Sequence, residues 1–277
     1  MSVQRAMLSG QRLHLQHGPI DLVIGAEGAR EAAFEAASAA FEGVLQRLVD
    51  ELDLLRAPWR ADAAPDGPVA RAMWGAVGRH AGFVTPMAAV AGAVADHVLG
   101  AMRATPGLRR AYVNNGGDIA LWLGRGERFR LAIAGAPARI EIASGDGIGG
   151  VATSGFGGRS LSLGIAESVT VLARDAAHAD AAATLIANAV DLPGHGAITR
   201  VPAQEMRPDS DLGARLVVAH VGDLSQDEVA RALARGAETA RGMQAAGLIR
   251  AAALVLRGQV QTVGTEEFIG MRENAHA

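Results

Sequence analysis

The sequence predicts an α+β fold in which packed helices cover mixed β-sheets. Segments with helical periodicity and segments with strand periodicity alternate along the 277 residues, but no strand–helix–strand unit recurs at a steady period. Hydrophobic residues make up 49% of the chain and charged residues 20%, which is typical of a packed core. Because neither a linker nor a repeat divides the chain, we expect residues 1–277 to form a single domain, with a strand pair at 1–24 and a tail at 272–277 at its periphery.

The first hundred residues predict a strand pair followed by helices. Apolar residues alternate on either side of glycine turns within residues 5–24, as in a β-hairpin. Apolar side chains then recur every three or four residues between 28 and 55, which predicts one long helix closed by Pro58. Two further helices are expected, at 68–80 and 86–104.

The rest of the chain predicts short strands around two more helices. A strand, a glycine turn and a second strand are expected at 110–123, and an alanine-rich helix at 178–190. Ser225, with Glu228 three residues later, predicts a capping box at the start of a helix that ends near Ala246. Alternating or β-branched runs predict the other strands, at 129–134, 138–143, 150–153, 167–173, 198–201 and 215–221, and two within 251–263.

The composition excludes several classes of chemistry. The chain has no cysteine, so disulfides, thiolate catalysis and cysteine metal sites are excluded. All 26 basic residues are arginine, so Schiff-base chemistry and a P-loop lysine are excluded as well. A net charge of −3 argues against nucleic-acid binding. Because the N-terminus has no apolar segment of signal length and no apolar run could span a bilayer, we expect a cytoplasmic protein with no membrane partner. Alanine-rich helices suit packing within one chain or between two, which leaves a homo-oligomer open.

A carboxylate and a hydroxyl lie on one face of a predicted helix. Asp180 and Thr184 are four residues apart, so their side chains are neighbours on the helix surface. Both are oxygen donors, which is the ligand type that Mg²⁺ prefers. The simpler alternative is structural, with Asp180 favouring the helix dipole and Thr184 bonding back to the helix. His178 is expected on another face of this helix, away from any metal, and His80 is expected to be an exposed or capping histidine.

Two glycine-flanked polar segments precede this helix. Residues 114–118 are Asn-Asn-Gly-Gly-Asp, and residues 152–155 are Ala-Thr-Ser-Gly. Glycine lets the backbone approach a ligand closely, and bare backbone N–H groups suit a phosphate. Ordinary turns are the alternative, because Asn-Gly is also a strong hairpin signal and Gly/Ser is common turn content.

Taken in order, these segments resemble the ApbE-like superfamily, whose best-known members are metal-dependent flavin transferases. The matching motifs lie within about residues 80–190, at 114–119 (Asn-Asn-Gly-Gly-Asp-Ile), 152–155 (Ala-Thr-Ser-Gly), 169–171 (Val-Thr-Val) and 179–184 (Ala-Asp-Ala-Ala-Ala-Thr). The resemblance implies an ApbE-like α+β domain. It also implies a Mg²⁺ ion held by the Ala152 carbonyl, Asp180 and Thr184.

The resemblance further implies a flavin nucleotide, FAD or FMN, as the ligand. Gly116, Gly117 and Asp118 would line its pocket, and Thr153 and Ser154 would stand near the diphosphate. The full implied set of cofactor-binding residues is Asn114, Gly116, Gly117, Asp118, Thr153, Ser154 and Gly155.

The chain also departs from the transferases of the superfamily. They carry a His-x-x-Asp-Pro segment between Thr-Ser-Gly and Val-Thr-Val, whereas residues 156–168 contain neither His nor Asp-Pro. The chain therefore resembles a shorter branch of the superfamily. Arg159 is the cation within this interval, and a guanidinium suits bidentate contact with phosphate. Arg159 and Asp180 are accordingly the predicted catalytic residues.

These features predict a protein that binds a phosphate-bearing small molecule, with a flavin nucleotide as the leading candidate, together with Mg²⁺. The expected reaction is metal-dependent phosphoryl chemistry, either diphosphate cleavage or a divergent FMN transfer. Two alternatives stay open: a non-catalytic cofactor-binding or delivery protein, and an unrelated small-molecule enzyme on the same fold. Arg207, Asp209 and Asp211 form either a loop salt bridge or a second metal or substrate site.

Overall fold

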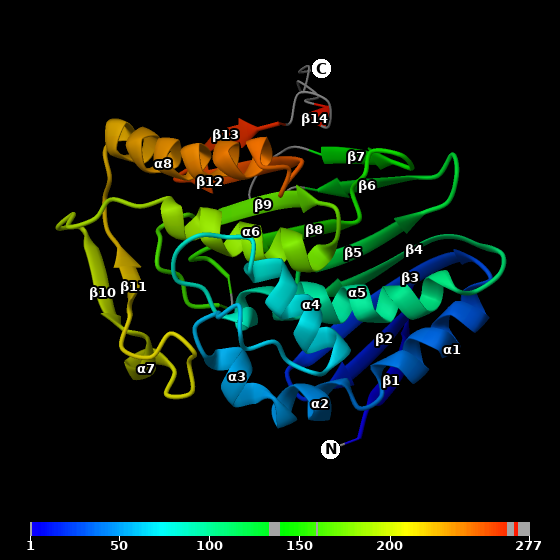
Figure 1. Cartoon of the computed structure of the whole chain (residues 1–277). Coiled ribbons are helices and arrows are strands. Elements are labelled where there is room, and N and C mark those ends of the chain that lie inside the picture. The colour runs from blue at the N-terminus through cyan, green and yellow to red at the C-terminus, as the bar shows by residue number, and fades with distance from the viewer. Residues whose placement is uncertain (1, 133–138, 159, 265–268, 271–277) are drawn as a thin grey trace.

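A large antiparallel sheet, covered by helices on one face, dominates the computed structural model (Figure 1), which describes residues 2–132, 139–158, 160–264 and 269–270. Nine strands form this sheet in the order β1-β2-β3-β4-β5-β8-β9-β12-β13. Their bounds are β1 Gln4–Leu8, β2 Arg12–His17, β3 Ile20–Gly28, β4 Leu108–Asn115, β5 Asp118–Leu123, β8 Gly150–Ser154, β9 Ser168–Ala173, β12 Ala251–Leu256 and β13 Gln259–Val263.

Two smaller sheets accompany the large one. The first consists of β6 (Arg128–Ala132), β7 (Arg139–Ala143) and β14 (Ile269–Gly270), and its β7 packs on the outer face of β5, β8, β9 and β12. The second pairs β10 (Ile198–Pro202) with β11 (Leu216–Val221) and carries the short helix α7 (Ala203–Met206). This second unit, residues 198–221, stands at one side of the molecule in Figure 1 and is called the arm below.

Four helices lie next to one another over the inner face of the sheet, in the order α1, α5, α6 and α8. Strand residues alternate between the two faces, so Leu13, Leu15, Leu22 and Ile24 are buried beneath the helices. The helical bounds are α1 Arg30–Phe41, α2 Val44–Asp50, α3 Leu52–Arg56, α4 Pro68–Val77, the 3₁₀ helix η1 Pro86–Ala89, α5 Val90–Arg103, α6 Ala176–Ala189 and α8 Gln226–Ala245. The structure therefore has the α+β class that the sequence predicts.

The hydrophobic core has two halves that meet at α6. Ala177 and Ala181 of this helix pack with the half beneath α1 and α5, whereas Ala182 and Ile186 pack with the half beneath α8. Methyl side chains let neighbouring helices approach on both sides. The helix that carries Asp180 and Thr184 is thus held at the centre of the molecule.

Two sequence-based predictions of elements are wrong. The expected helix at 28–55 is broken into α1, α2 and α3. Gly43 adopts the left-handed conformation with φ of 70° and ends the first run, and the second break falls at Glu51, whose φ of −112° is not helical. The expected strand pair at 5–24 is three strands, and β2 and β3 contribute fully buried side chains to the core. The capping box is confirmed, since the Glu228 N–H donates to Ser225 Oγ at 3.3 Å and the Ser225 N–H donates to the Glu228 carboxylate at 2.8 Å.

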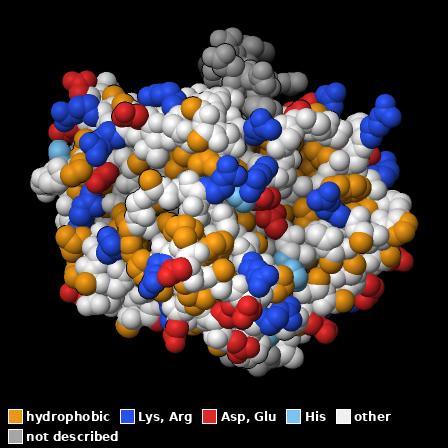
Figure 2. Space-filling view, in the orientation of Figure 1, with side chains coloured by type: hydrophobic (Ala, Val, Ile, Leu, Met, Phe, Trp, Pro, Cys, Tyr) orange, Lys and Arg blue, Asp and Glu red, His pale blue; other side chains and the backbone are white. Residues whose placement is uncertain are grey.

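The surface mixes charges of both signs. Figure 2 shows acidic and basic side chains interspersed on the face seen there, with apolar patches between them. No helix within the described part of the chain is both long and apolar enough to cross a membrane.

A very close contact between two helices of the core is made at Gly92, near the start of α5. A Cβ atom at this position would lie 2.2 Å from the carbonyl oxygen of Ala176, at the start of α6. Backbone atoms of α6 cannot move aside as a flexible side chain would. Glycine at position 92 is therefore a steric requirement of the α5–α6 contact.

A pair of alanine substitutions within α5 tests this requirement. Gly92→Ala should destabilise the fold by about 3 kcal/mol or more, because the added methyl group overpacks a rigid backbone contact. Gly100→Ala is the matched control, since position 100 is exposed in the same helix and a methyl group added there would meet no atom within 4 Å. It should stabilise the fold by roughly 0.5–1 kcal/mol. Urea unfolding of both variants gives the comparison, and equal stabilities would refute the steric argument.

Candidate functional site

The two glycine-flanked segments of the sequence lie side by side in the structure. The Thr153 N–H donates to Asp118 Oδ1 at 3.1 Å, which joins the start of β5 to the end of β8. Thr153 Oγ1 lies 3.0 Å from Thr170 Oγ1 on β9, so the Val-Thr-Val strand is tied to the same corner. Within the first segment, the Gly117 N–H donates to Asn114 Oδ1 at 2.8 Å and closes the turn. Asp118 is therefore held at the end of an internal strand of the sheet, where β5 begins.

The start of α5 connects this corner to α6. Asn115 is buried, and its Nδ2 donates to the Ala91 carbonyl at 3.1 Å. The next residue along α5, Gly92, donates its N–H to Asp180 Oδ2 at 3.0 Å. Neighbouring backbone groups of one helix thus orient side chains from the first and the last of the sequence motifs.

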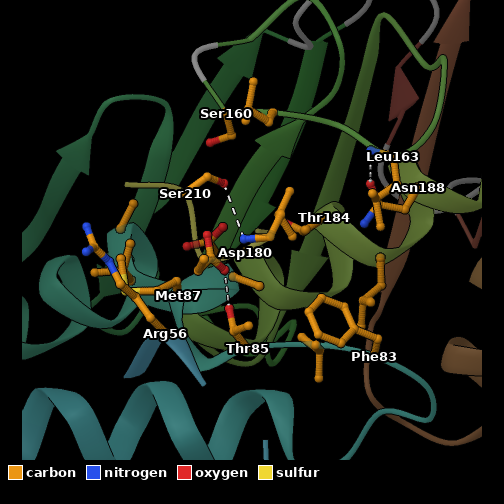
Figure 3. Close-up of a pocket in the computed structure, with 18 of the residues that line it drawn as sticks. Arg56, Phe83, Thr85, Met87, Ser160, Leu163, Asp180, Thr184, Asn188 and Ser210 are labelled. Carbon is orange, nitrogen blue, oxygen red and sulfur yellow. Dashed lines mark hydrogen bonds between the residues drawn. The ribbon is translucent and has the colours of Figure 1, made fainter. Parts of the chain in front are cut away.

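A cavity of about 300 Å³ opens where these elements meet. Asp180 and Thr184 project into it from α6, and Arg56 and Ser210 lie across it in Figure 3. Asp118 also reaches it, so three of the predicted site residues share one concave surface. The described lining residues are Arg56, Phe83, Val84, Thr85, Met87, Ala88, Val90, Ala91, Asp118, Ser160, Leu161, Leu163, Asp180, Thr184, Leu185, Asn188, Arg207, Asp209, Ser210, Asp211 and Leu212.

The arm closes one side of this cavity. Arg56 of α3 donates to Asp209 at 3.2 Å, and the buried Thr85 hydroxyl donates to Asp211. These two contacts fasten the loop that follows α7 to the helical layer. We call this pair of contacts the clasp. The sequence analysis left a salt bridge within residues 207–211 as one alternative; the ion pair observed at this loop joins Asp209 to Arg56 of α3 instead, and the loop also lines the cavity.

A third contact supports the clasp. The Arg215 guanidinium carbon lies 3.4 Å from the centroid of the Phe83 ring, in a cation–π contact. Phe83 itself lines the cavity. The arm therefore contacts the helical layer at two places, through the loop that follows α7 and through Arg215, which directly precedes β11.

The cavity is acidic. Four carboxylates line it (Asp118, Asp180, Asp209 and Asp211) against two guanidinium groups (Arg56 and Arg207), so the described lining has two more acidic than basic groups. Burial raises the pKa of the Asp180 carboxyl well above its usual range, and the charges of Asp118 and Asp96 raise it further. A cation between Asp180 and Asp118 would relieve this unfavourable concentration of negative charge.

Asp96 and His178 belong to the support of α6. Asp96 accepts the N–H groups of Ala176 and Ala177 at 3.0 and 2.8 Å, which caps the helix from α5. Burial and the neighbouring Asp175 raise the pKa of Asp96 to about 7. His178 Nδ1 lies 2.6 Å from Asp175 Oδ1, and His178 is not among the described residues that line the cavity.

The other predicted residues lie around the cavity rather than on its surface. Ala152 is buried in β8, which also contains Thr153 and Ser154. Asn114 lies in β4, Gly116 and Gly117 form the turn between β4 and β5, and Gly155 directly follows β8. His80 is half-buried, and its pKa is lowered to about 4. Burial is the largest cause, and the charges of His178 and Arg79 lower the pKa further. Arg159, predicted to be catalytic, lies outside the described residues.

Sequence reasoning missed several lining residues. Arg56, Phe83 and Thr85 come from the helical region before the motifs, and Asn188 from the last turn of α6. Their clasp partners are 153 and 126 positions away in the chain, so no local spacing could have indicated them. Asn188 could have been found, since it lies one turn beyond Thr184 on the same helix.

Comparison with known proteins gives a family match and partial relatives. Residues 5–262 match the protein family described as AbpE bacteria. A UPF0280 protein of Methanothrix thermoacetophila is 43% identical over 111 residues, which cover 39% of this chain and 46% of that protein. A UPF0280 protein of Methanosphaerula palustris is 41% identical over 138 residues, covering 48% of this chain and 56% of that protein. The chain spans about half the length of the curated relatives it matches.

A solved structure is similar over the full length of the chain. The flavinyl transferase ApbE of Pseudomonas stutzeri, in its apo form, superposes with a TM-score of 0.44 and 13% sequence identity, and the match covers 98% of both chains.

Proposed function

The chain belongs to the family described as AbpE bacteria, and from this premise and its cavity we propose that it binds a flavin nucleotide together with Mg²⁺. The observation that supports this most is the meeting of Asp118, Asp180 and Thr184 in one acidic cavity. An anionic phosphate would be repelled by a lining with an excess of carboxylates. A divalent cation would reverse that local charge and so allow the phosphate to bind.

The donor set suits Mg²⁺. Among the described residues no cluster of three His, Asp or Glu side chains forms a metal site, so the candidate set combines different oxygen donors. We propose that Asp180, Thr184 and the Ala152 carbonyl hold the ion. Thr184 lies one helical turn from Asp180, and the N–H of Gly92 fixes the orientation of the Asp180 carboxylate. When bound, Mg²⁺ would act as a Lewis acid on a phosphoryl oxygen.

The remaining walls suit the organic part of a nucleotide. Phe83, Met87, Leu163 and Leu185 are apolar lining residues on which a flat ring could pack. The volume of about 300 Å³ lies at the lower end of the range for small-molecule sites, roughly 300–1,000 Å³. We propose that the described cavity holds one nucleotide moiety, with the Asn114–Asp118 turn and the Thr153–Gly155 turn near the phosphate.

Diphosphate cleavage is the reaction that demands least of these residues. A water molecule would attack one phosphorus, the bond to the bridging oxygen would break, and FAD would yield FMN and AMP. Asp180 and Asp118 lie where carboxylates could orient that water, and Arg159 is the proposed cation for the leaving phosphate. Transfer of FMN to a protein hydroxyl is the more demanding variant, because residues 156–168 lack the His-x-x-Asp-Pro segment.

A cofactor-binding or delivery protein is the second candidate function. The described cavity contains no histidine, and the chain contains no lysine, so carboxylates are the available proton acceptors there. The acid–base chemistry of a transfer reaction would therefore be limited, whereas binding needs only the cation and the walls.

Removing the charge of Asp180 should weaken Mg²⁺ binding. Asp180→Asn keeps an acceptor for the Gly92 N–H, so the fold should persist while the affinity falls at least tenfold, or about 1.4 kcal/mol. Mg²⁺ affinity of the parent should rise with pH, because the raised pKa of Asp180 means that a proton competes with the ion. Calorimetry measures both effects. Asp227→Asn, at an exposed position of α8 outside the cavity lining, is the matched control and should bind normally; equal affinity in the Asp180 variant would contradict the assignment.

Flavin nucleotides should stabilise the protein only when Mg²⁺ is present. A ligand at 100 times its Kd adds about 2.7 kcal/mol to the free energy of unfolding, which thermal denaturation detects readily. FMN and FAD should raise Tm in the parent and much less in Asp180→Asn. Adenosine and pyridine nucleotides serve as comparison ligands. If none of these nucleotides changes Tm at concentrations of about 1 mM, the nucleotide proposal is wrong.

Mass spectrometry separates the catalytic from the non-catalytic candidate. With FAD, Mg²⁺ and a peptide bearing a Thr acceptor, we expect no flavin-modified peptide and slow release of FMN and AMP that Asp180→Asn abolishes. A modified peptide formed at a turnover of order 1 s⁻¹ would show that transfer survives without the missing segment. Absence of both products, in a protein that flavin stabilises, would support the delivery function.

A further inference from the structure

A second cleft lies on the opposite face of the large sheet. It has a volume of about 160 Å³ and is formed at the turn between β1 and β2, the end of β3, the start of α1, and β4 and β6. Its strand residues Gly25 and Tyr112 alternate with the buried residues Ile24 and Val113, so they face away from the helical layer. The described lining residues are Gly10, Gln11, Arg12, Gly25, Ala26, Glu27, Arg30, Arg110, Tyr112 and Phe129, and none of them lines the candidate functional site.

Three guanidinium groups from three elements converge on this cleft. Arg12 donates through Nε to the Ser9 carbonyl at 3.0 Å, and Arg30 donates through Nε to the Ala26 carbonyl at 2.9 Å. Bonds to carbonyl oxygens hold a guanidinium in place but do not neutralise its charge. The third group, Arg110, donates to the carboxylate of Glu27.

The charge in the cleft is not balanced by its own lining. Glu27 is the one carboxylate among the described lining residues, and Arg109 also contacts it at 3.4 Å. Outside the lining, Glu127 contacts Arg110 at 3.7 Å and Arg109 at 3.5 Å. The hydrogen bond from Arg110 lowers the pKa of Glu27, and the charges of Arg109 and Arg30 lower it further. The cleft therefore carries an excess of two positive charges in a chain whose net charge is −3.

A strained residue holds one of these arginines. Gln11, in the tight turn before β2, has a φ of 55°, a conformation that side-chain-bearing residues rarely adopt. Its side-chain oxygen accepts a hydrogen bond from Arg30, across the cleft. Glycine would adopt this conformation without strain, whereas a residue with a side chain costs about 1 kcal/mol there.

Aromatic rings form the floor of the cleft. Tyr112 lies opposite Gly25 in the β3–β4 pairing, and a Cβ atom at position 25 would be 2.3 Å from the tyrosine ring, so the ring lies directly over the backbone of β3. Phe129 meets it edge to face, with ring centroids 6.0 Å apart. Arg110 lies 5.4 Å from the Phe129 centroid. The cleft thus combines two aromatic rings with cationic side chains.

We propose that this cleft is a binding site for a small oxyanion, a carboxylate or a phosphate. The Arg12 and Arg30 guanidinium groups, which donate to uncharged oxygens, match the geometry of both anions, and Gln11 positions Arg30. An apolar cavity of about 150 Å³ holds benzene, so a volume of 160 Å³ admits an aromatic carboxylate or inorganic phosphate. The site is independent of the proposed flavin function.

The single tyrosine of the chain provides a specific probe of this site. Tyr112 is the one tyrosine among the 277 residues, so 3-fluorotyrosine incorporation places one ¹⁹F nucleus in the cleft. The protein is titrated separately with benzoate and with inorganic phosphate at constant ionic strength, which is maintained with chloride. We expect a saturable shift of the ¹⁹F resonance with a Kd of about 1 mM or tighter for at least one probe. A larger effect of benzoate would identify carboxylates as the ligand source, and a larger effect of phosphate would identify phosphates.

Two variants and a control complete the test. Arg30→Gln and Gln11→Gly should each weaken binding at least tenfold, and Gln11→Gly should leave Tm unchanged or higher because it relieves the turn. Arg241→Ala, an exposed arginine on α8, is the matched control and should bind as the parent does. The proposal is overturned if neither probe gives a saturable shift up to about 10 mM, or if Arg30→Gln binds as tightly as the parent.

Discussion

The backbone of α5 at Ala91 and Gly92 is the constraint on which the candidate site depends. The Gly92 N–H orients Asp180, and the Ala91 carbonyl receives Asn115, so adjacent peptide groups position side chains that lie 65 residues apart in the chain. This arrangement exists only because α5 approaches α6 closely enough to leave no room for a Cβ atom. The small side chains of α6 permit the same closeness on its other side. The packing of α5 against α6 in the core therefore also determines the geometry of the site.

The sequence predicted the local parts of this structure well. The α+β class, the capping box at Ser225 and the strands that carry the motifs all follow from short-range patterns of periodicity and hydrogen-bonding residues. The break of the helix at Gly43 was missed because a single glycine within an apolar repeat is ambiguous until its φ is known. The third strand near the N-terminus was missed for a related reason, since the alternation of its residues merges with that of its neighbour across a short turn.

The site was only half predictable. Asp118, Asp180 and Thr184 belong to motifs whose spacing signals chemistry, and they line one cavity. The opposite wall comes from Arg56, Phe83 and Thr85, which carry no motif and are placed by contacts with the arm. Long-range pairing of this kind depends on how the sheet and the helices pack. No short-range pattern in a single sequence indicates which distant residues will pair. The role of the 207–211 loop was accordingly left open by the sequence and is structural at least in its contacts with Arg56 and Thr85.

The clasp also has a consequence for the order in which the protein acquires its cavity. Its two contacts close chain loops of 126 and 153 residues, among the most non-local contacts of the site. Closing loops of that length is entropically unfavourable and slow, so such contacts form after the local hairpins and helices. On a ribosome, the first half of the chain could assemble its strands and helices while the wall supplied by the arm was still unsynthesised. Ligand binding would then be one of the last properties to appear as the chain folds, and among the first to be lost when the arm detaches.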